Sequence, residues 1–229
     1  MKCRLINIIG NWTIININKL STYLQHKTDS ACMPRFGNHP ANLTIQSPRR
    51  IINSKKIFIG DDVKLGSNCT LKALTGYPGG WMKHPESKHI ENNFDSEIWI
   101  GHRVTASGSL YLSAAKKISI EDDVMLASNI YISDCTHGHD HAEIPYKYQG
   151  ITGVSPILIK KGSWIGQNVV VMPGVTVGEM SIIGANSVVT ADVPDKCLAV
   201  GVPARIIKKW SREEKRWVDW HETDKRSFG

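Results

Sequence analysis

IKKGSWIGQNVVVMPGVTVGEMSIIGANSVVTADVP, residues 159–194, divides into six units of six residues. An aliphatic residue opens every unit, and a small or β-branched residue stands four places later. The two sets are Ile159, Ile165, Val171, Val177, Ile183 and Val189, and Ser163, Val169, Val175, Ser181, Ser187 and Val193. A helix repeats apolar residues about every 3.6 positions and a strand every second one, so a period of six indicates a chain that turns a corner at each unit. Stacked coils of this kind form a β-solenoid, and both sets of residues are expected to point into its interior.

Glycine and asparagine recur between the expected strands of this repeat. Both tolerate a positive φ, which tight corners often require. We therefore expect positive φ at the corner residues Gly166, Asn168, Gly174, Gly178, Gly184 and Asn186.

The hexads extend beyond this stretch, with two interruptions. They are clear from Ile59 to Leu71 and from Ile100 to Ile132, and weaker units begin at Ile45. The period is lost over residues 74–97 and 138–156, which are polar and rich in turn residues. Long excursions from a solenoid often line its binding face, so 74–97 is a candidate acceptor site, with a solvated loop of no function as the alternative.

The two ends of the chain do not follow the repeat. Residues 1–44 contain proline, glycine and several asparagines, which predicts an irregular arm or cap, and 45–210 form the solenoid domain. Ser211 to Glu214 fits a capping box, so 211–229 is expected to form a short C-terminal helix, ending near Thr223, and a tail. A helix there that only caps the open end of the core is the alternative to one with a functional role.

Composition narrows the class of protein. The 229 residues are 41% hydrophobic, enough for one domain with a sizeable core, and carry a formal charge of +7. That charge favours an anionic partner such as a phosphorylated cofactor or an acidic glycan; nucleic acid and membrane contact have less support. Five cysteines without a CxxC pair suit reduced thiols in the cytoplasm. The first twenty residues lack a signal-peptide core and an apolar run long enough to span a bilayer.

Several motifs together resemble the hexapeptide-repeat acyltransferases, particularly the branch of galactoside, maltose, virginiamycin and polysaccharide O-acetyltransferases. They are SWIG at 163–166, MPGVTVG at 172–178, IGANSVVTADVP at 183–194 and AVGVPARII at 199–207. The resemblance covers about residues 45–210. It implies a left-handed parallel β-helix of triangular section, a homotrimer, and acetyl-CoA bound between neighbouring prisms without a metal.

Histidine is a suitable general base for acetyl transfer to a hydroxyl. Acetyl transfer to a hydroxyl requires removal of the hydroxyl proton, and the unperturbed pKa of histidine fits that role at neutral pH. In the family the base ends a coil just before a long loop, and His137 in DCTHGHDH takes that place; His139 is the alternative. Asp134 is a candidate to orient the imidazole, unless it only caps a turn. A solvated turn or a metal site is the competing interpretation of the cluster, although no second cluster with zinc-ligand spacing is present.

The resemblance also assigns residues to acetyl-CoA. Trp164 matches the Trp of the WIG motif, with a surface aromatic as the alternative role; Ala185 and Thr190 match positions that contact the pantetheine arm. Arg205 and Lys208 match two basic residues that contact the CoA phosphates. Basic side chains bind anionic phosphates through charge-assisted hydrogen bonds. The sequence departs from the family pattern at three positions, and each departure weakens one expected contact. Lys208 stands where relatives often have Arg, Ala191 replaces a common Lys, and Gln167 replaces a frequent Ser or Asn.

The function that these features predict is transfer of acetyl from acetyl-CoA to a sugar hydroxyl, on a bacterial surface polysaccharide or its precursor. One rival is an N-acetyltransferase acting on an amino-sugar nucleotide or an antibiotic. Others are a non-catalytic solenoid that serves as a scaffold or binding protein, and a zinc-dependent carbonic anhydrase on the same solenoid. The sequence lacks the glycine spacings of Rossmann and P-loop nucleotide sites.

Overall fold

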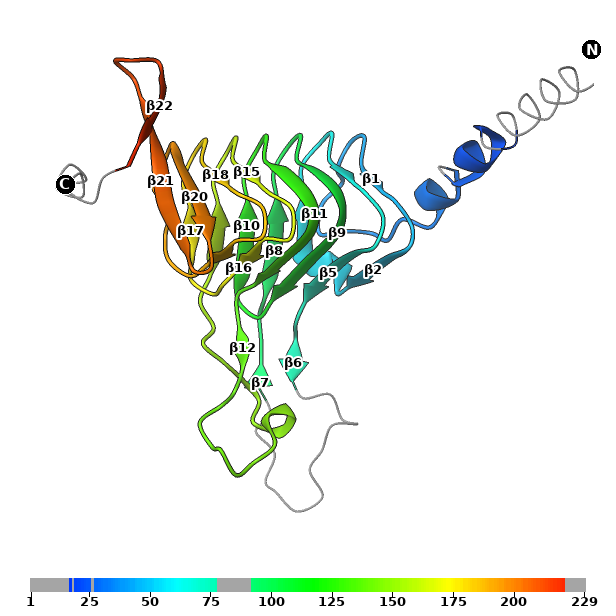
Figure 1. The fold of residues 1–229 in the computed structure, drawn as a ribbon. Coiled ribbons are helices and arrows are strands. Elements are labelled where there is room, and N and C mark those ends of the chain that lie inside the picture. The colour runs from blue at the N-terminus through cyan, green and yellow to red at the C-terminus, as the bar shows by residue number, and fades with distance from the viewer. Residues whose placement is uncertain (1–16, 18, 26, 78–91, 221–229) are drawn as a thin grey trace, which may run out of the picture.

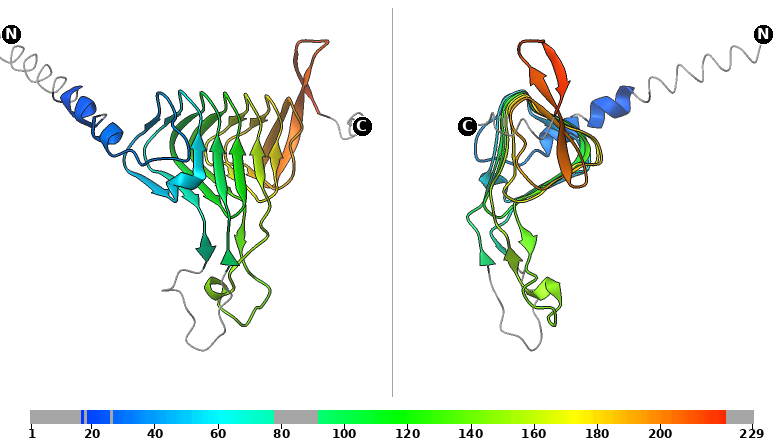
Figure 2. Two further views of the ribbon diagram at one scale, coloured as in Figure 1. Left: turned by 180° about the vertical axis from the view of Figure 1, so that it is seen from behind. Right: turned by 60° about the vertical axis from the view of Figure 1, so that its left-hand side comes forward.

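The computed structural model describes residues 17, 19–25, 27–77 and 92–220. Over this part, short strands of successive coils stack in parallel, and a view towards the coil axis shows a triangular section (Figures 1 and 2). No helix within it combines the length and apolar character that crossing a bilayer requires.

The parallel strands form three ladders, one for each side of the section, the first two belonging to one sheet through β9 and β11. The first contains β1 (Thr44–Ile45), β4 (Lys64–Leu65), β9 (Thr105–Ala114), β11 (Met125–Ser133), β15 (Trp164–Ile165), β18 (Ile182–Ile183) and β20 (Cys197–Gly201). The second contains β2 (Arg49–Ile52), β5 (Cys69–Ala73), the later parts of β9 and β11, β16 (Val170–Val171) and β19 (Val188–Val189). The third contains β3 (Ile57–Ile59), β8 (Glu97–Ile100), β10 (Lys117–Ile120), β14 (Ile157–Ile159) and β17 (Thr176–Val177).

The core consists of the hexad positions. All twelve residues assigned to the interior of 159–194 are buried, none more than 4% exposed, which confirms that prediction. The inward serines hydrogen-bond to backbone carbonyls: Ser163 Oγ donates to Gly178 O at 2.7 Å, and Ser181 Oγ to Pro194 O at 2.7 Å. A buried hydroxyl is thereby satisfied, so a small polar residue is tolerated where the coil bends.

The corner predictions are confirmed at some positions and wrong at others. Asn168 (φ 59°), Asn186 (φ 60°) and Gly174 (φ 82°) have positive φ, whereas Gly166, Gly178 and Gly184 do not. A Cβ built on Gly178 would lie 2.4 Å from the backbone nitrogen of Asp195 on the next coil. This glycine is therefore required by the close approach of two coils.

The first coil is covered by the segment that precedes it. Residues 17, 19–25 and 27–31 are helical, which the sequence did not predict, and the chain is irregular from there to residue 43. Phe36 is buried in the core, and the Asn38 amide pairs with the backbone of Ile59 at 2.7 and 3.0 Å. Asp29 ties the helix to the coil through Ser47 and through Arg49, whose Nη1 lies 3.1 Å from its Oδ1.

The predicted C-terminal helix is wrong within the described residues. β20 is followed by β21 (Ala204–Ser211) and β22 (Arg216–Asp219), which form an antiparallel hairpin. Ser211 Oγ does accept a hydrogen bond from Glu214 N at 3.1 Å, as a capping residue would, but Lys215 (φ 49°) reverses the chain. Trp210 and Trp217 then meet across the hairpin with ring centroids 5.7 Å apart. Residues 221–229 lie outside the described part.

Replacing Lys215 with glycine distinguishes the hairpin from the helix that the sequence predicted. In the hairpin, glycine relieves the left-handed backbone, and the free energy of unfolding should rise by up to about 1 kcal/mol after the greater entropy of the unfolded chain is counted. In a helix the same change would lower it by about 1 kcal/mol. Chemical denaturation of the two proteins gives the sign, and a loss of stability would contradict the hairpin.

Candidate functional site

A cavity of about 330 Å³ lies where the second ladder meets the loops. Its walls come from β5, β9 and β11 on three successive coils, from the start of the 74–97 loop, from the residues just before the 138–156 loop and Ile151 within it, and from the coil that begins at β16. The lining residues are Lys72, Leu74, Tyr77, Tyr111, Ser113, Tyr131, Ser133, Cys135, Thr136, His137, Ile151, Val171, Met172 and Pro173. A mixture of aromatic, aliphatic and a few polar side chains is typical of a small-molecule site.

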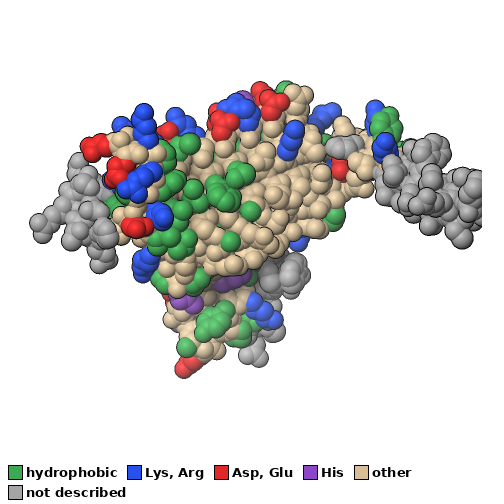
Figure 3. All heavy atoms as spheres, turned by 45° about the horizontal axis from the view of Figure 1, so that its top comes forward, with side chains coloured by type: hydrophobic (Ala, Val, Ile, Leu, Met, Phe, Trp, Pro, Cys, Tyr) green, Lys and Arg blue, Asp and Glu red, His purple; other side chains and the backbone are tan. Residues whose placement is uncertain are grey.

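His137 reaches this cavity from a strand that leaves the solenoid. β12 (Thr136–His137) pairs antiparallel with β13 (Ile151–Thr152), which carries the chain out of the stacked coils, and the His137 side chain is exposed. Histidine side chains gather where this loop leaves the coils (Figure 3). The position at the end of a coil is the one that the sequence assigned to the base.

The two loops meet at His137. β6 (Gly76–Tyr77) and β7 (Asn92–Asn93) are the described ends of the first loop, whose residues 78–91 lie outside the described part. The Tyr77 ring meets the His137 ring edge to face, with centroids 5.1 Å apart and planes at 63°. Tyr77 also donates to Lys147 O at 3.2 Å, and Ile151 N donates to Asn92 Oδ1 at 3.0 Å. Loop residues about 60 to 70 positions apart therefore support one imidazole.

His139 lies differently. Its Nδ1 is 3.2 Å from the His137 carbonyl oxygen, so the ring turns back onto the backbone, and it does not line the cavity. The loop beyond it is held by Gln149, a buried side chain that bonds to His141 N at 3.0 Å and to two carbonyl oxygens. No pattern in the sequence distinguished Gln149 from other polar loop residues.

Asp134 does not orient His137, and that expectation needs correction. Its carboxylate is fully buried and accepts hydrogen bonds from the backbone amides of Ala115 at 2.6 Å and of Lys116 and Lys117 at 2.7 Å. Both oxygens are therefore used to close the corner of the preceding coil, which is the turn-capping alternative. The physical reason is position: a residue that points into the corner cannot also face the loop.

Two tyrosines in the cavity were missed from the sequence. Tyr111 and Tyr131 occupy the same register on β9 and β11, and their rings stack with centroids 5.0 Å apart and planes at 7°. Burial raises the pKa of the Tyr131 phenol, an effect that its hydrogen bond with Ser133 partly offsets. The available signal was that each precedes an inward residue, Leu112 or Ile132, and so points outward on neighbouring coils.

Cys135 also lines the cavity, but its thiol is not activated as a nucleophile. The residue is 7% exposed, and its sulfur lies 3.6 Å from Ser133 Oγ. Burial raises the pKa of the thiol, with smaller opposing effects from Ser133 and Lys72. At neutral pH the group is therefore a protonated thiol, which is the unreactive form. Over the described ranges, no three histidine, cysteine or acidic side chains gather as a metal site would require.

The residues assigned to acetyl-CoA do not line this cavity. Trp164 is 44% exposed on the first ladder, and Ala185 follows β18 of the same ladder, one coil later. Thr190 comes directly after β19. Arg205 and Lys208 lie on β21; the Arg205 guanidinium donates to Ala204 O at 2.9 Å, and Lys208 Nζ is 3.8 Å from Asp219. Trp164 and Lys208 share a register on the sheet that continues the first ladder, whereas Thr190 follows the second ladder.

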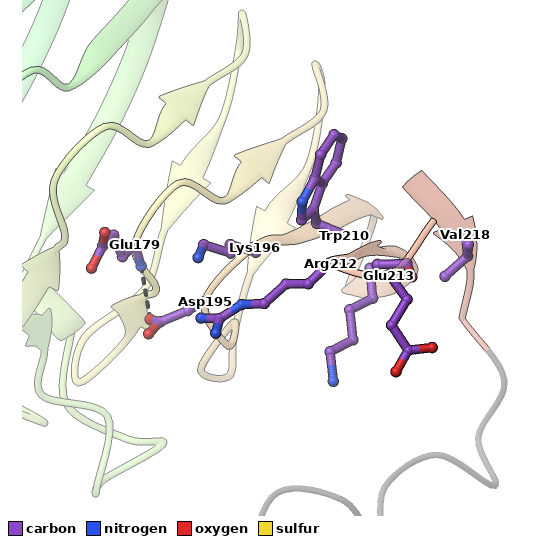
Figure 4. A pocket seen from close by; sticks show the side chains of 9 residues that line it. Glu179, Asp195, Lys196, Trp210, Arg212, Glu213 and Val218 are labelled. Carbon is purple, nitrogen blue, oxygen red and sulfur yellow. Dashed lines mark hydrogen bonds between the residues drawn. The ribbon is translucent and has the colours of Figure 1, made fainter. Parts of the chain in front are cut away.

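A larger cavity, of about 720 Å³, lies beside the hairpin (Figure 4). It is lined by Glu179, Asp195, Lys196, Lys209, Trp210, Ser211, Arg212, Glu213 and Val218. Three carboxylates balance three cations there, and Asp195 already accepts from Glu179 N at 2.8 Å and from Lys160 Nζ at 3.1 Å. Its described lining contains no histidine, so the smaller cavity is the better candidate for chemistry.

Comparison with known proteins agrees with the repeat. Residues 156–191 match the family described as bacterial transferase hexapeptide (six repeats). This stretch therefore carries the repeat of that transferase family. Two Escherichia coli K12 relatives are a putative lipopolysaccharide biosynthesis O-acetyl transferase, 32% identical over 52% of this chain and 64% of the relative, and galactoside O-acetyltransferase, 34% identical over 60% and 64%. The matches therefore span a little under two thirds of these curated relatives.

Two solved acyltransferase structures share the fold. AntD, an N-acyltransferase from Bacillus cereus solved with dTDP and 3-hydroxybutyryl-CoA, has a TM-score of 0.60 at 21% identity over 78% of this chain and 86% of its own. An acetyltransferase from Vibrio cholerae O1 biovar eltor solved with acetyl coenzyme A has a TM-score of 0.50 at 26% identity, over 77% and 72%. The AntD likeness bears on fold alone.

Proposed function

We propose that this protein moves acetyl from acetyl-CoA to a hydroxyl of a saccharide, on a bacterial surface polysaccharide or its precursor in the cytoplasm. The observation that carries the proposal is the position of His137, which ends a coil, lines the cavity and is supported by both loops. The O-acetyltransferase names of the two Escherichia coli relatives support the choice of a hydroxyl acceptor.

In the proposed reaction, the acceptor hydroxyl enters the cavity beside His137. The imidazole takes its proton while the oxygen attacks the thioester carbonyl; the C–S bond then breaks, and the proton leaves with the CoA sulfur as a thiol. Acetyl has then passed from sulfur to oxygen, and the imidazole is neutral again. Asp134 takes no part, and Gln149 and Tyr77 act by holding the loops.

The assembly is part of the proposal. None of the residues assigned to acetyl-CoA lines the cavity that contains His137; they are Trp164, Ala185, Thr190, Arg205 and Lys208. A homotrimer of left-handed prisms, the arrangement that the resemblance implies, would set these residues of one subunit opposite the cavity of another. Acetyl-CoA would then bind between subunits, with the basic residues at its phosphates.

Product analysis tests the proposal against the N-acetyltransferase alternative. The protein is incubated with acetyl-CoA and a panel of oligosaccharides, amino sugars and amino-sugar nucleotides, and acetylated products are detected by mass spectrometry. Mild alkali cleaves an ester and leaves an amide intact. The proposal predicts an alkali-labile acetyl group on a saccharide; transfer to amines alone would contradict it.

A further inference from the structure

The cavity beside His137 has an unbalanced charge. Lys72, from β5, lines it, and among the described residues that line it there is no carboxylate. Within the described part of the chain the Lys72 ammonium has no hydrogen bond or ion pair. By contrast, Lys160 and Lys161 at a corner of the solenoid are paired with Asp195 and Glu179 at 3.1 and 3.6 Å. An ammonium inside a cavity without a counter-ion favours an anionic occupant.

Lys72 lies close to the other groups of the site. It shares a register with Ser113 on β9 and, through it, with Ser133 on β11, so one cation and two hydroxyls follow each other on three successive coils. This polar row lies two residues beyond the row formed by Tyr111 and Tyr131. The cavity thus offers an aromatic strip beside a row of hydrogen-bonding groups, with His137 at its end.

The aromatic strip has an open face. Tyr111 covers one face of the Tyr131 ring, while the residue in register on the other side is Val170, which is much shorter. The Tyr131 side chain is 44% exposed, and Val171, Met172 and Pro173 continue the cavity on that side. A ring with a flat apolar face, such as a pyranose, fits against a tyrosine placed in this way.

From these contacts we infer that the acceptor is an acidic saccharide: its pyranose ring packs on Tyr131, and its anionic substituent, a carboxylate or a phosphate, pairs with Lys72. The inference rests on the proposed function and names the substrate class of the same site. The anion is that of the acceptor because the phosphates of CoA are separated from the thioester, which must react beside His137, by the whole pantetheine arm.

Matched acceptors and lysine variants test the inference. The acceptors are a uronic acid oligosaccharide, its neutral methyl ester and a phosphorylated sugar; the proteins are wild type, Lys72→Met, Lys72→Arg and Lys64→Met. Lys64 is an exposed lysine on β4 that does not line the cavity, so its variant is the control for loss of one charge. Thermal melting checks that each variant is folded.

Wild type should have a KM for the acid about 10- to 100-fold below that for the ester, the ratio expected for one charge-assisted hydrogen bond. Lys72→Met should remove this preference, while Lys72→Arg and Lys64→Met should keep it. Tyr131→Ala should raise KM for acid and ester alike. A preference shared by the phosphorylated sugar identifies an anion site of either chemistry. Equal KM values for acid and ester in wild type, or a preference that survives in Lys72→Met, would overturn the inference.

A binding measurement separates this inference from the proposed function. Saturation-transfer NMR of the uronic acid oligosaccharide with the protein, without acetyl-CoA, needs no catalysis. If no acceptor is acetylated but the oligosaccharide binds wild type and not Lys72→Met, the reaction is wrong and the acidic site stands. Equal binding to both proteins would contradict the site whatever the reaction.

Discussion

Replacing His137 with alanine is expected to lower kcat for acetyl transfer by about 10²- to 10⁴-fold, the usual contribution of a positioned general base. The KM for acetyl-CoA should change little, because the residues assigned to the cofactor lie elsewhere on the solenoid. Steady-state rates of CoA thiol release at saturating acceptor measure both constants.

His139→Ala is the matched control for this variant. It removes an imidazole two residues away whose Nδ1 bonds to the His137 carbonyl and which does not line the cavity. Its kcat should stay within a few-fold of wild type. Loss of activity in His139→Ala with retention in His137→Ala would move the base to His139, the alternative that the sequence left open.

Asp134→Ala should lower the free energy of unfolding by about 3–5 kcal/mol. Three backbone amides lose a charged acceptor at 2.6 to 2.7 Å, and hydrogen bonds to charged groups contribute about 1.5–3 kcal/mol each, not additively. Chemical denaturation measures the change. Asp140→Ala, which removes an exposed carboxylate from the same loop region, should stay within about 0.5 kcal/mol of wild type.

The activity of Asp134→Ala distinguishes its two assigned roles. At a temperature where the variant is folded, kcat per folded molecule should remain close to that of wild type, because the carboxylate closes a corner and does not touch the imidazole. A variant that unfolds like wild type but loses kcat would restore the orienting role that the sequence suggested.

The hexads could be predicted because their period is local and strict. Each leading aliphatic, such as Ile165 or Val171, must point inward for a coil to stack, so the pattern determined which residues are buried. The corner glycines were harder to interpret. Positive φ and close approach of two coils both favour glycine, and only the three-dimensional spacing shows that Gly178 serves the second need.

The C-terminal hairpin and the cavity could not be predicted for different physical reasons. Ser211 and Glu214 make a local contact that a helix and a turn share, and the conformation of Lys215 decides between them. The cavity depends on contacts between residues far apart in the sequence: Lys72, Tyr111 and Tyr131 come together through coil register, and Tyr77 meets His137 through two loops. Periodicity alone gives no information about which outward side chains meet.

A crystal structure with CoA and an acceptor taken from the product screen would test the central claim most directly. The account predicts that the reacting hydroxyl lies in the 330 Å³ cavity, within about 2.6–3.2 Å of a His137 ring nitrogen, the range for direct proton transfer. An acceptor bound in the cavity beside the hairpin, or with its hydroxyl out of reach of His137, would contradict it.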